Sequence, residues 1–470
     1  MFSLPVQSRR QLLQRAAGGF GAIALSGMLA ESLNAAPGSP SADPLAPKQP
    51  HHPAKAKNII FLFMGGGVSH VDTFDPKPQL TADHNKTLNV HNYRGHIGDF
   101  KQHFKKAQWE FRPRGQSGIE VSDLFPYVGD VIDDVAVIRS LTTDHIAHYE
   151  ATLGMHTGSF SFARPSMGSW VSYGLGTENR NLPSFVVITS ATPYARGQNW
   201  NNGFLPGSHQ GMQVFPGTTP IANMNRRAAT SELQSMELDL LREMNRVNLE
   251  QAAHDEQLEA RIKSFETAFG MQTEAPEVFD ISNETQATLD LYGLTPGDTK
   301  SFGWNCLIAR RMIEKGVRFV ECIDVGSANN WDDHSDMLNH ARLAKNVDQP
   351  IAGLIRDLKQ RGLLEDTLVV WTTEFGRTPY MAEKDAKGRD HHPMVFSSWI
   401  AGAGVKKGIV YGASDEYGIS VVDKRVHVHD FHATILHLLG IDHTRLTYRH
   451  SGRDYRLTDV FGNVVHDVLS

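Results

Sequence analysis

Five short runs of apolar residues dominate the hydrophobic pattern of the chain. They cover residues 58–64, 135–139, 185–189, 317–323 and 367–372. Each run is nearly continuous, whereas a half-exposed strand would alternate apolar with polar positions. The runs therefore predict strands that are buried on both faces of a largely parallel sheet.

Helical patterns separate these runs. Residues 350–361 are expected to form a helix, with Pro350 in its first turn and Gly362 as its terminator. Strands that alternate with helices predict an α/β fold with a doubly wound, mostly parallel sheet. In such sheets the ligand lies beyond the carboxyl ends of the strands, so chemistry is expected in the loops there.

One long segment departs from this alternation. Residues 230–269 contain no Pro or Gly, and apolar side chains recur at helical spacing. The pattern predicts one long or two consecutive amphipathic helices, a helical insertion at about residues 226–272. The ordinary use of such an apolar face is packing on the core, and a homo-oligomer formed through the insertion is the alternative.

The N-terminus has the features of a twin-arginine export signal over residues 1–36. Arg9 and Arg10 precede a weakly apolar, glycine-diluted stretch that ends at Ala35 and Ala36. The alternative is a short amphipathic helix. This signal predicts export to the periplasm or cell surface. Because the stretch is shorter than the roughly 20 residues that span a bilayer, we expect no membrane span after signal removal. The Pro-rich residues 37–56 predict a flexible linker, and residues 57–470 the folded domain.

Composition narrows the function classes. The 470 residues carry 46 Lys and Arg against 52 Asp and Glu, a formal charge of −6, so no nucleic-acid partner is expected. The 2 cysteines exclude a disulfide scaffold and a multi-cysteine metal cage. The 23 histidines permit a metal site built from imidazole and carboxylate ligands.

Polar clusters follow four of the predicted strands. Their candidate metal ligands are His70, Asp72, His148, Asp332, His334, Glu374, His391 and His392. Any one of these has an ordinary explanation as a surface histidine or a helix cap. Together, at strand ends that meet on one edge of a sheet, they predict a site for one or two divalent ions, with zinc, calcium, magnesium or manganese as candidates.

Two arginines lie close to these clusters in the sequence. Arg377 and Arg389 are candidates for gripping a substrate oxyanion, because a guanidinium binds such groups through two hydrogen bonds. Surface salt bridges are the alternative use of both side chains.

The order of these motifs resembles an exported bacterial family known as domain of unknown function 1501. The motifs are NIIFLFMGGGVSHVDTFDPKP, HYEATLGMHTG, WDDHSD, TLVVWTTEFGRTP, GRDHHP and YRHSGRDYRLTDVFG, and they cover the chain from Asn58 to Ser470. The sequence is similar, more distantly, to the alkaline phosphatase and sulfatase superfamily. That resemblance implies an alkaline-phosphatase-like fold, divalent metal ions and transfer of phosphoryl or sulfuryl groups.

The superfamily pattern is carried over only in part. The resemblance implies that Asp332, His334 and either His391 or His392 hold a first metal, and that Glu374 belongs to a second, together with His148 and either His70 or Asp72. The usual acidic ligand after the first strand is replaced by Gly65. His148 stands where sulfatases have the residue that becomes formylglycine, so that mechanism is excluded and His148 is expected to be a ligand or a general base acting on water.

These residues favour an exported metal-dependent hydrolase that cleaves a phosphate or sulfate ester with metal-activated water. Its substrate would be an anionic small molecule or glycan ester. The alternative is a catalytically degenerate fold that acts as a binding module for anionic glycans or a protein partner. A third possibility, redox chemistry at iron or manganese, rests on the ligand set alone.

Overall fold

The computed structural model describes residues 43–93, 96–222, 230–251, 256–325 and 330–470. The compact unit comprises Leu45–Ser470. The expected export signal and the first residues of the expected linker lie outside the described residues. Within the described ranges, no helix combines the length and apolarity required to cross a bilayer.

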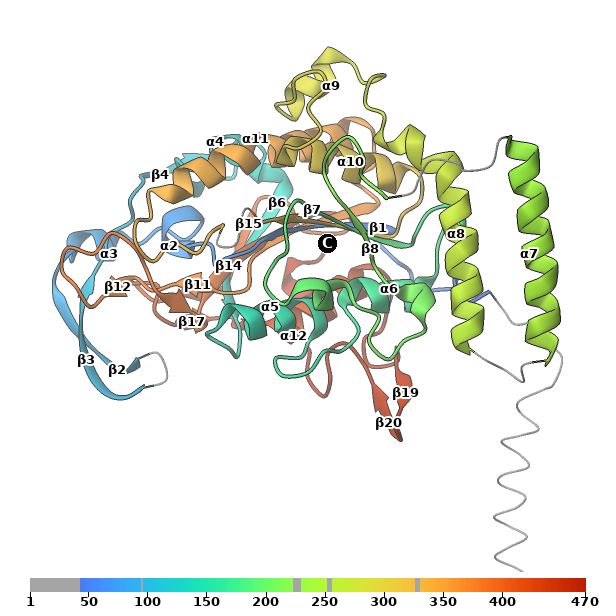
Figure 1. The fold of residues 1–470 in the computed structure, drawn as a ribbon. Helices are drawn as coiled ribbons and strands as arrows, with labels where there is room; N and C mark the ends of the chain where they lie inside the picture. Colours follow the sequence, from blue (N-terminus) through green and yellow to red (C-terminus); the bar gives the residue numbers. More distant parts are fainter. Residues whose placement is uncertain (1–42, 94–95, 223–229, 252–255, 326–329) are drawn as a thin grey trace, which may run out of the picture. The chain divides into compact units, whose positions relative to one another are not determined.

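A nine-stranded sheet forms the centre of this unit (Figure 1). Its strand order is β15-β6-β14-β10-β1-β9-β7-β8, with β18 paired to β6. The strands are β1 (Asn58–Met64), β6 (Val135–Thr142), β7 (Phe185–Thr189), β8 (Met212–Val214), β9 (Phe319–Asp324), β10 (Thr367–Thr372), β14 (Phe396–Gly402), β15 (Ile409–Tyr411) and β18 (Val426–His427). All neighbours are parallel except β14, which is antiparallel to both β10 and β6. The predicted α/β fold with a doubly wound, mostly parallel sheet is confirmed.

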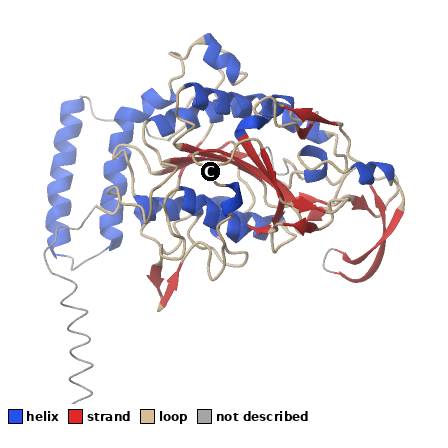
Figure 2. Ribbon diagram, turned by 180° about the vertical axis from the view of Figure 1, so that it is seen from behind, coloured by secondary structure: helices blue, strands red, loops and turns tan. Residues whose placement is uncertain are grey.

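Helices cover both faces of the sheet (Figure 2). The helices of the described residues are α2 (His70–Thr73), α3 (Pro78–Ala82), α4 (Pro126–Gly129), α5 (His148–Thr157), α6 (Met167–Leu175), α7 (Ser231–Gln251), α8 (Glu256–Phe279), α9 (Gln286–Leu291), α10 (Phe302–Glu314), α11 (Asn339–Gln360) and α12 (Val428–Leu438). In Figure 1, α4, α10 and α11 lie above the sheet, and α5, α6 and α12 lie below it. Short 3-10 helices cover Ile132–Asp134, Arg196–Trp200, Gly207–His209 and His466–Val468.

Smaller groups of paired strands lie outside the central sheet. They are β2 (Thr87–Tyr93) with β3 (His96–Phe104) and β12 (Tyr380–Met381), β4 (Phe111–Arg114) with β5 (Ile119–Ser122), β11 (Gly376–Arg377) with β13 (His391–His392), β16 (Ala413–Ser414) with β17 (Val421–Asp423), and β19 (Tyr448–His450) with β20 (Arg453–Tyr455). The β11–β13 pair bears on function, because it holds two of the candidate ligands.

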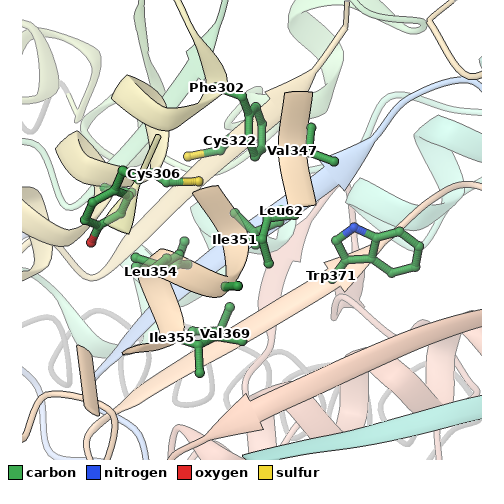
Figure 3. Packing of buried hydrophobic residues seen from close by; sticks show 14 of the residues in the cluster. Leu62, Phe302, Cys306, Cys322, Val347, Ile351, Leu354, Ile355, Val369 and Trp371 are labelled. Atoms are coloured by element: carbon green, nitrogen blue, oxygen red, sulfur yellow. The ribbon is translucent and has the colours of Figure 1, made fainter. Parts of the chain in front are cut away.

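The continuous apolar runs fill two cores at once. Along β1, Ile60 and Leu62 belong to the core under α10 and α11, whereas Ile59 and Phe61 belong to the core on the opposite face. Side chains alternate between the faces of a strand, so a strand that is covered twice must be apolar throughout. Figure 3 shows the first of these cores, where Ile351 and Leu354 of α11 pack near Leu62 of β1.

Two local predictions are revised by the structure. The helix expected at 350–361 begins at Asn339, so Pro350 lies inside α11 and not in its first turn. Part of the segment expected to be a flexible linker is packed against the domain: the backbone N–H groups of Lys48 and Ala56 donate to Leu175 and Leu438, at 2.9 and 2.8 Å. The ordered domain therefore includes residues that precede position 57.

Candidate metal centre

The carboxyl ends of the parallel strands β6, β9 and β10 lie on one edge of the sheet, and the separate strand β13 lies beside them. The loop after β6 leads to His148 at the start of α5, and the loop after β9 carries Asp332 and His334. Glu374 follows β10, and His391 lies on β13. Because these strands are parallel, their ends bring together residues that are far apart in the sequence.

Four of the predicted ligands converge to a single cluster. It consists of His148, Asp332, His334 and His391, whose candidate ligand atoms all lie within 4.8 Å of one another. The Nε2 atoms of the three histidines lie 3.1, 2.9 and 3.2 Å from Asp332 Oδ1, in that order. The Nε2 atoms of His334 and His391 are 2.9 Å apart.

The other ring nitrogen of each histidine has its own acceptor. His148 Nδ1 donates to Glu374 Oε1 at 2.5 Å, His334 Nδ1 to Asp390 Oδ1 at 3.0 Å, and His391 Nδ1 to the carbonyl of Ile146 at 2.8 Å. A proton on each Nδ1 leaves the Nε2 lone pairs directed at one another and at a carboxylate oxygen. This set of converging acceptors favours a bound cation. A histidine whose other ring nitrogen donates to a carboxylate or carbonyl is typical of a metal ligand.

Arg377 supports the carboxylate of this cluster. Its fully buried guanidinium donates to Asp332 Oδ1 at 2.6 Å and to the carbonyls of Gly66 and Gly67. Burial alone would raise the pKa of Asp332, but the contacts with the three histidines and the charge of Arg377 outweigh it and lower the pKa. Asp332 is therefore a carboxylate and able to bind a cation.

The pKa values of two histidines of the cluster shift in opposite directions. Burial lowers the pKa of His391 to about 4, so its ring is neutral, as a metal ligand requires. For His148, burial acts in the same direction, but Asp332 and Glu374 outweigh it and raise the pKa. Glu374 holds the ring of His148 from behind and is not among the four clustered residues, whereas the sequence suggested it as a ligand of a second metal.

The triple glycine after β1 serves packing in this structure. Gly66 has φ +117°, and a Cβ built there would lie 2.6 Å from the backbone nitrogen of Trp331. Its N–H donates to Glu374 Oε1 at 2.9 Å. The glycines therefore let the β1 loop approach the segment that carries Asp332.

Tyr194, in the loop after β7, belongs to the site but had no signal in the sequence. Its ring stacks on His148 with 4.3 Å between centroids, and its hydroxyl donates to Asp332 Oδ2 at 3.4 Å. The next two residues, Ala195 and Arg196, have φ of 58° and 52°. Two consecutive non-glycine residues in the left-handed region mark a strained turn, which Asn199 holds by donating to the Tyr194 carbonyl at 2.8 Å.

Asp72 and Arg389 form a separate buried ion pair. Arg389 Nε donates to Asp72 Oδ2 at 2.7 Å, and the rest of the guanidinium donates to Asp72 Oδ1 and to the carbonyls of Thr378, Lys105 and Lys106. The structure therefore does not support the prediction of Asp72 as a metal ligand or of Arg389 as an oxyanion-binding group. Arg377 is likewise bonded to protein oxygens, although it does lie at the cluster.

His70 and His392 face each other away from the cluster. Their rings are 6.1 Å apart, and each Nε2 donates to a backbone carbonyl, of Gly418 and Ile419 respectively, at 3.0 and 2.7 Å. Neighbouring residues of a strand point to opposite sides, so β13 can direct only one of its two histidines to Asp332. That residue is His391, which settles the alternative left open by the sequence.

The family model for "Protein of unknown function (DUF1501)" matches residues 56–469. The chain belongs to the DUF1501 family. The family resemblance drawn from the motifs is confirmed. The comparison with curated protein sequences gave no match.

Solved structures give DUF1501 several distant relatives in fold. The PsFucS1 sulfatase from Pseudoalteromonas sp. matches with 13% identity and TM-score 0.34, over 82% of this chain and 68% of its own. A protein in the alkaline phosphatase superfamily from Vibrio parahaemolyticus matches with 9% identity and TM-score 0.35, over 83% of this chain and 69% of its own. The phosphonate monoester hydrolase SpPMH from Silicibacter pomeroyi matches with 10% identity and TM-score 0.32, over 82% of this chain and 73% of its own. All these TM-scores are below 0.5, so the activity has to be argued from the residues of the site.

Proposed function

We propose that this DUF1501 protein is an exported, metal-dependent hydrolase of phosphate or sulfate esters. The observation that carries the proposal is the convergence of three imidazole nitrogens on Asp332, each ring held from behind by its own acceptor. Three histidines and one carboxylate suit zinc, manganese and iron. The export signal expected in residues 1–36 supports the proposed location, and the resemblance of the motifs supports the proposed class of substrate.

The residues of the cluster divide the work between them. His148, Asp332, His334 and His391 would hold a divalent ion. Such an ion supplies Lewis acidity, which polarises a phosphoryl or sulfuryl oxygen and lowers the pKa of water. Glu374 fixes the ring of His148, and Arg377 keeps Asp332 ionised and in place.

Two features make the cluster reachable by a substrate. The side chain of His334 retains 34% of its exposure, whereas Glu374 behind the cluster retains none. Tyr194 places a phenol hydroxyl beside Asp332, and its single proton would turn from Asp332 Oδ2 to a substrate oxygen when a substrate binds. Burial, together with the negative charge of Asp332, raises the pKa of Tyr194, so the hydroxyl keeps its proton. The proposed nucleophile is water, since His148 takes the place of the superfamily nucleophile.

The experiment starts with metal content by inductively coupled plasma mass spectrometry on natively exported protein, with His334→Ala beside it. One or more tightly held ions, lost in the variant, are expected. The protein loaded with that metal is then assayed on aryl phosphate and aryl sulfate esters, with and without chelator. Multiple turnover that a chelator abolishes supports the proposal, and absence of stoichiometric metal from the wild type contradicts it.

A binding module is the second candidate, and one observation favours it. Both buried arginines that were expected to grip an oxyanion are bonded to protein oxygens. Metal-dependent binding of a sulfated glycan without turnover at substrate excess would favour this candidate over the hydrolase. A paramagnetic signal that changes with oxidant would instead indicate redox chemistry at iron or manganese.

A further inference from the structure

Helix α7 carries an apolar stripe that the described residues of the chain leave exposed. The stripe consists of Leu233, Met236, Leu240, Met244 and Val247, with steps of three, four, four and three residues. These five side chains are between 39% and 68% exposed. The average step of 3.5 residues is the spacing at which one helix packs along another.

The stripe lies on the face of α7 that points away from α8. Leu238, Leu241 and Asn245 of α7 line a cleft of about 210 Å³ together with Ile262 and Phe269 of α8. Residues 238, 241 and 245 lie roughly 100–160° around the helix from Leu240, at about 100° per residue. The stripe is thus a second apolar face, and Figures 1 and 2 show α7 as the outermost helix of the chain, with α8 between it and the sheet.

The order of residues in the stripe is symmetric about Leu240. Met236 and Met244 stand four residues to either side, and Leu233 and Val247 stand seven residues to either side. An antiparallel pair of α7 helices would therefore place Leu240 against Leu240, Met236 against Met244, and Leu233 against Val247. A closed two-fold dimer requires a surface that is complementary to itself in this way.

The exposed area also fits pairing of two copies. The five side chains leave roughly 500 Å² exposed per copy, so pairing would bury roughly 1,000 Å² in total, about the minimum for a specific interface. We propose that the protein is a two-fold homodimer in which the α7 stripes of two copies pack antiparallel. This inference does not depend on the activity proposed for the metal cluster.

Cysteine cross-linking tests both the pairing and its direction. The native thiols, Cys306 and Cys322, are fully buried, so an introduced cysteine on α7 is the accessible thiol. Leu240→Cys should form an intermolecular disulfide under mild oxidation. Ser235→Cys, which lies about 140° around the helix from Leu240, is the matched control and should stay monomeric on a denaturing gel.

Direction is read from the ends of the stripe. In an antiparallel pair the two copies of residue 233 lie about 21 Å apart, since 14 residues rise 1.5 Å each, which is too far for a disulfide. Leu233→Cys alone should therefore not cross-link, but a mixture of the Leu233→Cys and Val247→Cys variants should. Cross-linking of Leu233→Cys as efficient as that of Leu240→Cys would overturn the antiparallel arrangement.

Mass in solution provides the independent readout. Light scattering should give twice the chain mass for the wild type at micromolar concentration, and the single-chain mass for Leu240→Glu. Because Leu240 is exposed, Leu240→Glu should keep the unfolding midpoint of a dilute, monomeric wild type. A monomeric wild type would overturn the proposal. So would a dimer that Leu240→Glu leaves intact, or a dimer that forms only when residues 1–42 are present.

Discussion

Glu374→Gln tests whether the carboxylate behind His148 governs metal affinity. Glu374 is fully buried and accepts from His148 Nδ1 at 2.5 Å, from Gly66 N at 2.9 Å and from the Thr373 hydroxyl at 2.9 Å. Glutamine has the same shape, and its amide oxygen can keep the bond to His148 while the amide nitrogen meets the hydroxyl. What is lost is the charge of the acceptor.

The expected magnitude follows from that single loss. A hydrogen bond to a charged group contributes about 1.5–3 kcal/mol, against about 1 kcal/mol for a neutral one, so the change weakens support of His148 by about 0.5–2 kcal/mol. Since about 1.4 kcal/mol corresponds to tenfold in affinity, the metal Kd should rise about 2- to 30-fold. Changes at such outer positions generally cost about 10- to 100-fold, a range that overlaps the upper part of this estimate.

The assay is a competition titration of the metal between the protein and a chromogenic chelator. Glu321→Gln is the matched control, because Glu321 is also a buried carboxylate bonded to a histidine, His156 Nε2 at 2.6 Å, but that pair lies outside the cluster. The control should lower stability and leave the metal Kd unchanged. An unchanged Kd in Glu374→Gln, or an equal change in the control, would refute the reasoning.

Three further outcomes are expected. Gly66→Ala should destabilise the fold by about 2 kcal/mol or more in denaturant unfolding and lower metal occupancy, because the added Cβ meets the backbone of the loop after β9. Gly118→Ala is the control, because Gly118 has φ +69° but open space around it. It should cost about 1 kcal/mol in denaturant unfolding and leave metal occupancy unchanged. Arg389→Met should cost about 3–5 kcal/mol by stranding the buried Asp72, with the metal Kd preserved; a lost metal site would contradict their separation. Burial lowers the pKa of His209 to about 3, so below pH 6.5 the unfolded chain takes up a proton that the folded chain excludes, and stability falls by up to about 1.4 kcal/mol per pH unit. In chelator, His209→Gln should flatten that slope, and a slope equal to that of the wild type would contradict the assignment.

The sheet was predictable wherever a buried strand is apolar throughout. Residues 58–64 and 367–372 match β1 and β10, because neither strand has a polar side that could break the apolar run. The antiparallel strand β14 was not predicted, since Ser397 and Ser398 interrupt its apolar pattern. Ser398 is tolerated there because its hydroxyl bonds to Thr372 at 2.6 Å on the neighbouring strand, a contact invisible in the sequence.

The sequence predicted the types of ligand in the metal cluster, but not which of the candidate residues belong to it. All four of its residues were among the candidates, because they follow strands whose ends share an edge. Sequence could not separate His391 from His392, since that choice depends on the pairing of β13 with β11. It could not assign Glu374 an outer position either, and Tyr194 lacked any motif. These outcomes are set by loop geometry, which residue spacing does not encode.

The cluster has a consequence for how the protein acquires its ion. Its ligands come from the crossovers after β6 and β9 and from β13, and even His334 and His391 are 57 positions apart. Only a fragment that includes residues 148–391 holds the full set, so a chain that has not yet brought these distant segments together cannot bind the ion as the native protein does. Ion binding would then act on the native state alone and add its whole free energy to global stability. A bound metal ion would therefore indicate that a given copy of the protein had completed folding.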